Sequence, residues 1–313
     1  AFHLLSSGFL KKEIPTEKTC LRPSFFDIRR GFSKSTSGVT SDSPDRDAFG
    51  EVLLYQPQPS PVDFLIQKSP FLKPFINGDT MAVISMKHFL EAGVHFGHQT
   101  KRWNPKMAPY IYGVKSGIHI IDLRQTLRKL QEAYQYVKQA SSEGKSMLFV
   151  GTKQSIQRIV LEEANRCDSA YINFRWLGGF LTNFSTVKQS IGRLQSFEEI
   201  AGEEGAYEGI LKKEALQIER KRQKLDRSLG GVRTMRDVPG VIFIIDCKRE
   251  HLAVREAQKL GIPIVGIADT NCDPSGIDYV IPGNDDSPKA VQLYASVIAT
   301  AVIEGRAARE KAI

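Results

Sequence analysis

From residue 118 onward, short apolar runs alternate with stretches of helical periodicity. The run Met147–Val150 is followed by apolar residues at 156, 159, 160 and 164, and the same alternation returns from Val241 to Ala301. Strands that are apolar on both faces and alternate with amphipathic helices are typical of a parallel sheet covered by helices on both sides. We therefore predict an α/β fold with a doubly wound parallel sheet.

The expected elements can be placed by residue number. Strands are expected at 118–121, 147–150, 171–172, 241–245, 264–267 and 279–281, and helices at 127–137, 156–164, 252–260 and 290–301. Two further helical periods, 187–200 and 211–229, interrupt the alternation on either side of a Gly-Glu-Glu-Gly break. Their spacing predicts an antiparallel helical hairpin inserted into the domain.

The first 80 residues differ in composition from the rest of the chain. They are rich in Ser, Thr, Pro and Phe and lack a sustained period, which is typical of an irregular extension. Within them, the Arg-Arg-Gly-Phe-Ser sequence at 29–33 is similar to a mitochondrial presequence cleavage site, so a targeting segment is expected. The predicted organisation is an extension at 1–80, a first part of the α/β domain at 81–185, the hairpin at 186–235, a second part at 236–306 and a tail at 307–313.

The charge balance favours a polyanionic partner. A net charge of +8 over 313 residues is compatible with nucleic acid or with an anionic membrane surface. No apolar run approaches the roughly 20 residues that span a bilayer, which argues against a membrane protein. The four cysteines are widely spaced and form no CxxC pair, so neither a zinc ribbon nor a disulfide framework is expected.

The second helix of the predicted hairpin is strongly basic. Its cations outnumber its acids by seven to three, a balance of +4 on one element, and they are Lys212, Lys213, Arg220, Lys221, Arg222, Lys224 and Arg227. Such a helix either presents a solvated surface or contacts phosphates, and the pattern leaves both interpretations open.

Because doubly wound sheets often bind nucleotides, an enzyme must be considered. The sequence has neither GxGxxG after its first strand nor GxxxxGK[ST]. The segment Gly151–Ser155 follows a strand and precedes a helix, where backbone N–H groups can hold a phosphate, but helix capping is the commoner role. Several aspartates lie near strand ends or in loops without a partner nucleophile, as is typical of caps and turns: Asp122, Asp246, Asp269, Asp273, Asp285 and Asp286. We expect no enzyme and no cofactor, with a nucleotide- or phosphate-binding enzyme as the alternative.

The densest group of chemically distinctive residues lies at 93–107. It combines three cations with Trp103, Phe96, two histidines and amide side chains. Cations neutralise phosphates, while rings and amides contact bases or riboses, and a similar mixture recurs at 175–183. His95 and His98 are spaced to share a metal ion, but without an accompanying HExxH motif or cysteine we expect hydrogen bonds to backbone or RNA instead, and no metal.

Five strings of the sequence, in this order, resemble a known family. They are EAGVHFGHQTKRWNPKMAPYIYG, RWLGGFLTN, DVPGVIFIID, LGIPIVGIADTNCDP and IPGNDDSPKAV. Over residues 86–306, but not 1–80, the chain resembles the bacterial-type family of ribosomal protein S-two, the second protein of the small ribosomal subunit. This resemblance implies a flavodoxin-like parallel sheet with an inserted coiled-coil hairpin. It also implies assembly into the small subunit against rRNA and neighbouring proteins, without catalysis, cofactor, membrane or small-molecule substrate.

The resemblance and the basic helix together define candidate RNA-binding residues. They are His95, His98, Lys101, Arg102, Trp103, Asn104, Lys106, Arg175, Trp176, Asn183, Lys212, Lys213, Arg220, Lys221, Lys224 and Arg227. Trp176 and Phe96 are equally compatible with a role as core anchors. The presequence-like segment and the string IPGNDDSPKAVQLY favour a ribosome-bound protein of the mitochondrial matrix over a plastid one. A protein with interaction partners outside the ribosome is a third interpretation.

Overall fold

The computed structural model describes residues 86–201, 207 and 211–312, all of which belong to the compact unit Pro59–Ile313. The extension predicted at 1–80, with its targeting segment, lies outside the described residues. Within the described ranges, no helix has the length and apolar character required to cross a bilayer.

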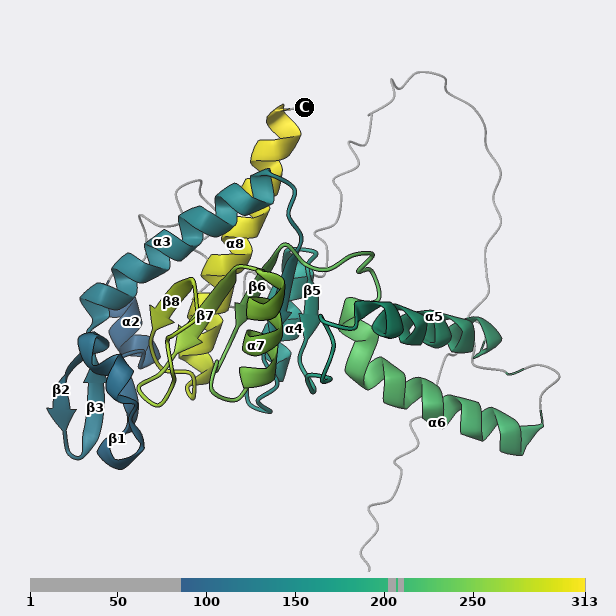
Figure 1. Cartoon of the computed structure of the whole chain (residues 1–313), viewed down its shortest axis with the longest axis horizontal. Coiled ribbons are helices and arrows are strands. Elements are labelled where there is room, and N and C mark those ends of the chain that lie inside the picture. The colour runs from purple at the N-terminus through teal and green to yellow at the C-terminus, as the bar shows by residue number, and fades with distance from the viewer. Residues whose placement is uncertain (1–85, 202–206, 208–210, 313) are drawn as a thin grey trace, which may run out of the picture. The chain divides into compact units, whose positions relative to one another are not determined.

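The centre of the unit is a sheet of five parallel strands (Figure 1). Its strands are β4 (Met147–Val150), β5 (Ala170–Ile172), β6 (Val241–Ile244), β7 (Ile264–Ala268) and β8 (Tyr279–Pro282). They lie side by side in the order β5-β4-β6-β7-β8, which is the flavodoxin-like order with its topological switch point between β4 and β6. Every residue of β4, β6 and β7 is buried, which explains why these runs are apolar throughout.

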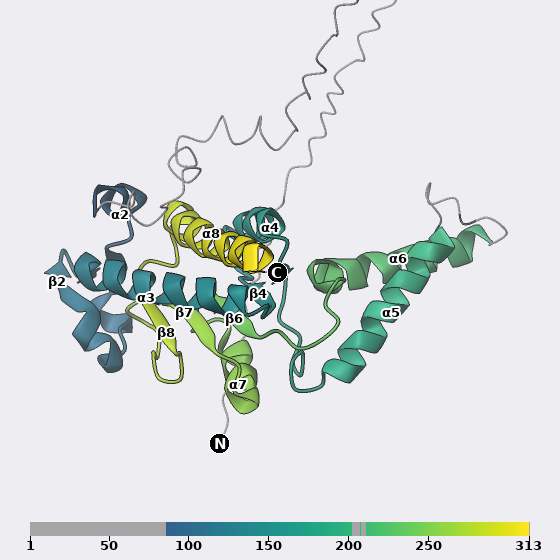
Figure 2. The ribbon, with the colours of Figure 1, turned by 90° about the horizontal axis from the view of Figure 1, so that it is seen from above.

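Helices cover both faces of this sheet (Figure 2). One face carries α3 (Leu123–Ser142), α4 (Gln157–Arg166), α8 (Pro288–Ala312) and the short α2 (Met86–Ala92), and the other carries α7 (His251–Leu260). Alternate residues of each strand supply the two cores, so that Phe149 packs under α3 and α8 while Leu148 packs on the α7 side. The expectation of a doubly wound α/β fold is confirmed.

A second, smaller sheet is antiparallel. It contains β1 (Phe96–Gln99), β2 (Ile111–Lys115) and β3 (Ile118–Ile121) in the order β1-β3-β2, with the 3-10 helices η3 (Thr100–Arg102) and η4 (Pro105–Tyr110) between β1 and β2. The strand predicted at 118–121 is therefore present, but it does not belong to the parallel sheet. Only its alternate residues His119 and Ile121 are fully buried, and such one-sided burial is typical of antiparallel strands.

The segment between β5 and β6 forms the helical hairpin. It consists of α5 (Phe184–Ala201) and α6 (Lys212–Leu229), which pack on each other, followed by the short η5 (Gly230–Val232). Leu229 and Val232 at its base are buried in the core on the α7 side of the sheet. A Cβ at Gly231 would clash with the carbonyl oxygen of Tyr171, so the returning chain passes directly against β5 at a position that only glycine can fill.

Candidate nucleic-acid interface

The N-terminal basic segment, residues 95–106, is fastened to the loop that follows β7. The backbone N–H of His98 donates to Oγ1 of Thr270 over 2.9 Å, and the N–H of Asn104 donates to the carbonyl oxygen of Thr270 over 2.8 Å. The side chain of Asn104 accepts the N–H of Lys106 over 3.0 Å and so caps η4. Two candidate residues, His98 and Asn104, thus hold the segment in place.

The three cations of this segment are placed differently. The ammonium of Lys106 donates to Asp273 over 2.7 Å and to Oγ of Ser275 over 3.0 Å. Lys101 and Arg102, in η3, are exposed, and neither has an ion-pair partner within the described ranges. Lys101 and Arg102 are therefore free to meet an external anion, whereas Lys106 already neutralises an internal one.

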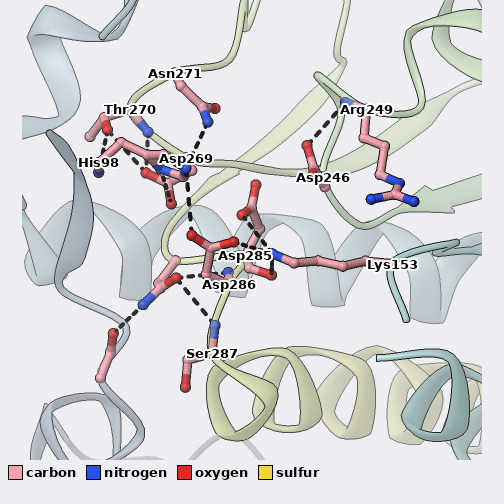
Figure 3. Close-up of polar contacts among 12 residues, drawn as sticks. His98, Lys153, Asp246, Arg249, Asp269, Thr270, Asn271, Asp285, Asp286 and Ser287 are labelled. Carbon is pink, nitrogen blue, oxygen red and sulfur yellow. Dashed lines mark hydrogen bonds and ion pairs between the residues drawn. The ribbon is translucent and has the colours of Figure 1, made fainter. Parts of the chain in front are cut away.

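The ring of His98 lies among polar groups from the loops that follow β7 and β8 (Figure 3). Its Nδ1 lies 3.1 Å from an oxygen of Asp269, and its Nε2 lies 3.0 Å from the amide nitrogen of Asn271 and 3.5 Å from Asp286. The neighbouring carboxylate of Asp269 raises the pKa of His98, and partial burial opposes this shift only in part. His95 does not share this site: its ring lies against Phe96, with centroids 4.0 Å apart and the two ring planes tilted by 38°.

Four aspartates gather beyond the carboxyl ends of β6, β7 and β8, in what we call the strand-end cluster (Figure 3): Asp246, Asp269, Asp285 and Asp286. Lys153, which follows β4, forms an ion pair with Asp286 and lies 3.9 Å from Asp285. Asp285 is only 2% exposed. Burial, together with the negative charges of Asp246 and Asp269, raises its pKa to about 8. Asp285 is therefore largely protonated at neutral pH.

The switch point between β4 and β6 is occupied by the chain's own side chains. Thr152 donates to Glu250, and Arg249 Nε donates to Thr152 Oγ1 over 3.2 Å. A Cβ at Gly151 would lie 2.9 Å from a methyl of Val160, so this glycine permits close packing of strand and helix. These contacts join the Thr152 side chain to the residues that precede α7.

Asp122 and Asp273, and Asp246 of the strand-end cluster, act as caps and turn residues. Asp122 accepts the N–H of Arg124 at the start of α3, and Asp246 accepts the N–H of Arg249 just before α7, each over 3.0 Å. Asp273 accepts the N–H of Ser275 over 2.9 Å. In the part of the chain that the structure describes, no group of three or more His, Cys, Asp and Glu side chains is arranged to hold a metal ion.

The aromatic residues of the N-terminal basic segment are partly exposed. Trp103 is 40% exposed and lies over the ring of His119, with centroids 5.2 Å apart. Phe96 is 48% exposed, so it is not a core anchor. Trp103, which directly follows Lys101 and Arg102 in the chain, thus presents ring surface of the kind that stacks on a base or ribose.

Most of the candidate residues in the aromatic loop, residues 175–183, contact other parts of the protein. Trp176 is 6% exposed, and its indole N–H donates to Glu256 over 3.1 Å, which makes it a core anchor. Asn183 accepts the hydroxyl of Thr186 over 3.0 Å at the start of α5. Arg175 is exposed. Of the three candidates here, Arg175 is the one best placed to meet RNA.

Sequence reasoning missed Glu256, on α7. Its carboxylate accepts the N–H groups of Gly179, Leu181 and Thr182 over 2.8, 2.9 and 3.2 Å, in addition to the indole N–H. Burial alone would raise its pKa, but these hydrogen bonds outweigh burial and lower it. The sequence feature that could have indicated it is the position of this acidic residue directly beside Ala257, on the apolar side of an amphipathic helix.

The second helix of the hairpin presents a group of exposed positive charges. All six candidate cations of α6 are exposed, and none has an ion-pair partner in the described ranges: Lys212, Lys213, Arg220, Lys221, Lys224 and Arg227. Arg222, which was not a candidate, instead pairs with Glu219 over 2.7 Å. Arg227 also lies over the ring of Phe174, 5.4 Å from its centroid. The helix is thus a row of charges available to a polyanion.

Comparison with known proteins agrees with this picture. A family model described as ribosomal protein S2 matches residues 89–305, well over half of the chain. The small ribosomal subunit protein uS2 of Geotalea uraniireducens (strain Rf4) is 59% identical over 229 residues, which cover 73% of this chain and 89% of the relative. The uS2 protein of Solibacter usitatus (strain Ellin6076) is 56% identical over 227 residues, covering 72% and 75% respectively. With its sheet order, its inserted hairpin and these matches, the chain belongs to the ribosomal protein S2 family.

Proposed function

We propose that the chain is a structural constituent of the small subunit of an organellar ribosome, where it binds small-subunit rRNA and neighbouring ribosomal proteins. Membership of a ribosomal protein family supports the structural role and agrees with the expectation that the chain is not an enzyme. The observation that supports RNA binding best is the exposed charge: eight candidate cations, two in η3 and six in α6, have no internal ion-pair partner among the described residues.

The physical basis of binding is neutralisation of phosphates. Each phosphate contact releases condensed counterions, so affinity falls steeply with salt, with a slope of roughly −0.7 to −0.9 per contact. The partly exposed Trp103 adds a surface on which an unpaired base can stack. The α/β domain acts as the rigid support for these groups, because the N-terminal basic segment and the hairpin are both joined to it through buried or hydrogen-bonded residues.

The organellar setting rests on the sequence of the extension. The Arg-Arg-Gly-Phe-Ser segment at 29–33 is similar to a presequence cleavage site, and we propose a ribosome-bound protein of the mitochondrial matrix, with a plastid as the alternative. Import of the full chain into isolated mitochondria and into isolated plastids, followed by protease treatment, decides between them. Protection in plastids alone would overturn the mitochondrial assignment.

A gradient experiment tests the ribosomal role itself. Organelles that express a tagged chain are lysed, treated with ultraviolet light to cross-link protein to RNA, and fractionated on sucrose gradients. We expect the tagged chain to sediment with small subunits and to yield cross-links to small-subunit rRNA. A chain that stays at the top of the gradient, without rRNA cross-links, would refute the proposal.

A further inference from the structure

A single carboxylate joins the aromatic loop to α7. One oxygen of Glu256, Oε1, accepts the indole N–H of Trp176 and the backbone N–H of Gly179. The other, Oε2, accepts the backbone N–H groups of Leu181 and Thr182 and lies 3.3 Å from the hydroxyl of Thr182. Four N–H donors that lie far from Glu256 in sequence thus converge on one side chain of a neighbouring element.

This loop leads directly into the hairpin. Residue 183 immediately precedes α5, and its backbone carbonyl accepts the N–H of Val187 at the helix start. The other end of the hairpin returns through Leu229 and Val232, which are buried in the core. The hairpin is therefore attached to the domain by apolar packing where α6 ends. Where α5 begins, it is attached by the buried side chains of Phe180, Leu181 and Ile191 together with the hydrogen bonds centred on Glu256.

We propose that Glu256 is a positioning residue that sets the direction in which the hairpin leaves the α/β domain. By fixing the residues before α5, it holds the cations of α6 at a defined separation from Lys101 and Arg102, so that both groups meet one folded RNA together. The claim that both groups of cations meet one RNA rests on the proposed function. The geometric part, that Glu256 sets the direction of the hairpin, does not.

The chemistry of the site predicts which substitution is informative. Glu256→Gln keeps the size of the side chain but replaces one acceptor oxygen with an NH₂ group. That group is a donor, and in either orientation it faces two N–H donors. The matched control is Glu162→Gln, which makes the same chemical change at an exposed position on α4, where Glu162 forms an ion pair with Arg158.

Distance measurements test the geometric part. Spin labels are attached to Gln195→Cys on α5 and Arg128→Cys on α3, in the full chain with Cys20→Ser; the remaining cysteines are buried. We expect Glu256→Gln to shift or broaden the distance distribution, and Glu162→Gln to leave it unchanged. Amide exchange at Gly179, Leu181 and Thr182 should accelerate about tenfold or more, because a charge-assisted hydrogen bond is lost, while exchange in β6 stays the same.

If Glu256→Gln does not fold, Trp176→Phe provides a milder test. It retains an aromatic ring in the core, removes the indole N–H and leaves a smaller side chain at that position. A smaller shift of the same kind is expected. Unchanged distances and unchanged exchange in whichever variant folds would overturn the assignment of Glu256.

Binding to small-subunit rRNA separates the two proposals. We expect the wild-type chain to bind and Glu256→Gln to bind about five- to tenfold more weakly, with the same salt slope, because the number of cations is unchanged. If the wild type does not bind, the proposed function fails, and the spin-label experiment still decides whether Glu256 orients the hairpin. If the wild type and Glu256→Gln bind equally, the role of Glu256 in aligning the two basic regions is wrong.

Discussion

The ammonium of Lys106 lies 2.7 Å from a carboxylate oxygen of Asp273, a residue that lies 167 positions further along the chain. Lys101 and Arg102, only a few residues earlier, have no such partner among the described residues. Cations that are close together in the sequence therefore have different roles. Lys106 fastens the N-terminal basic segment to the domain, and Lys101 and Arg102 are left for an external anion.

The first prediction concerns these three cations. Replacing Lys101 and Arg102 together by Ala should weaken binding to small-subunit rRNA about tenfold and reduce the salt slope by about two, because two phosphate contacts are lost. Lys106→Ala should leave the salt slope unchanged and cost less than about 1 kcal/mol of stability, since its ion pair is half-exposed. Filter binding at several salt concentrations measures the affinity and the salt slope of both variants. An equal reduction of the slope by Lys106→Ala would contradict this division of roles.

The second prediction concerns the hairpin. Changing Lys212, Lys213, Lys221 and Lys224 to Gln should lower the salt slope of RNA binding by about three to four while leaving the unfolding midpoint nearly unchanged, because all four side chains are exposed. The control changes the exposed Lys259 and Lys289, which lie on other helices, to Gln. A control that lowers the slope as much as the hairpin variant would indicate that α6 is not a specific RNA contact.

The third prediction concerns pH. The pKa of Asp285 is about 8 in the folded protein, far above its ordinary value, so the folded state holds a proton that the unfolded state releases above about pH 4. The stability contributed by this group is therefore complete in acid and is lost as the pH rises through about 8. Asp285→Asn mimics the protonated carboxyl, and urea unfolding should show that it is more stable than the wild type at about pH 9, by about 1 to 2 kcal/mol. A wild-type and Asn variant with parallel pH profiles would rule out this assignment.

The fourth prediction concerns the contact between α3 and α8. A Cβ at Gly305 would lie 2.6 Å from the Cβ of Ser141 on α3 and would also clash with the carbonyl oxygen of Lys138. Gly305→Ala should therefore destabilise the protein by about 2 to 3 kcal/mol, since neither the backbone nor the helix axis can move freely. The control is Gly192→Ala on α5, where a Cβ meets nothing within 4 Å and should stabilise the helix by up to about 1 kcal/mol. Thermal unfolding compares the two, and equal effects would be inconsistent with close helix packing.

Much of the fold was predictable because local patterns encode it. The strands at 147–150, 241–245 and 264–267 were evident as apolar runs, since both faces of a central parallel strand are buried. The hairpin was evident from its helical period. The strand at 118–121 was found as well, but its sheet was not, because pairing with β1 and β2 depends on contacts that a local apolar pattern does not specify.

The sequence predicted which residues make up the candidate interface, but not which of them face outward and which contact other parts of the protein. The sequence identified Trp176 as an RNA contact or a core anchor, and only the structure shows that its indole N–H meets Glu256, which lies 80 positions away. Likewise, nothing near Lys106 in the sequence indicates its distant partner Asp273. Whether a cation or a ring is available to a ligand depends on such tertiary contacts, and sequence spacing does not reveal them.

The close passage of Gly231 against Tyr171 has one further consequence. The hairpin segment leaves the sheet after β5 and returns at Gly231 directly beside β5. The length of the hairpin therefore does not affect the register of the parallel strands. Whole helical turns can be added to or removed from the tips of α5 and α6 together, because the two helices pack on each other and their base stays in place. The reach of the hairpin can thus change while its base on the sheet stays the same.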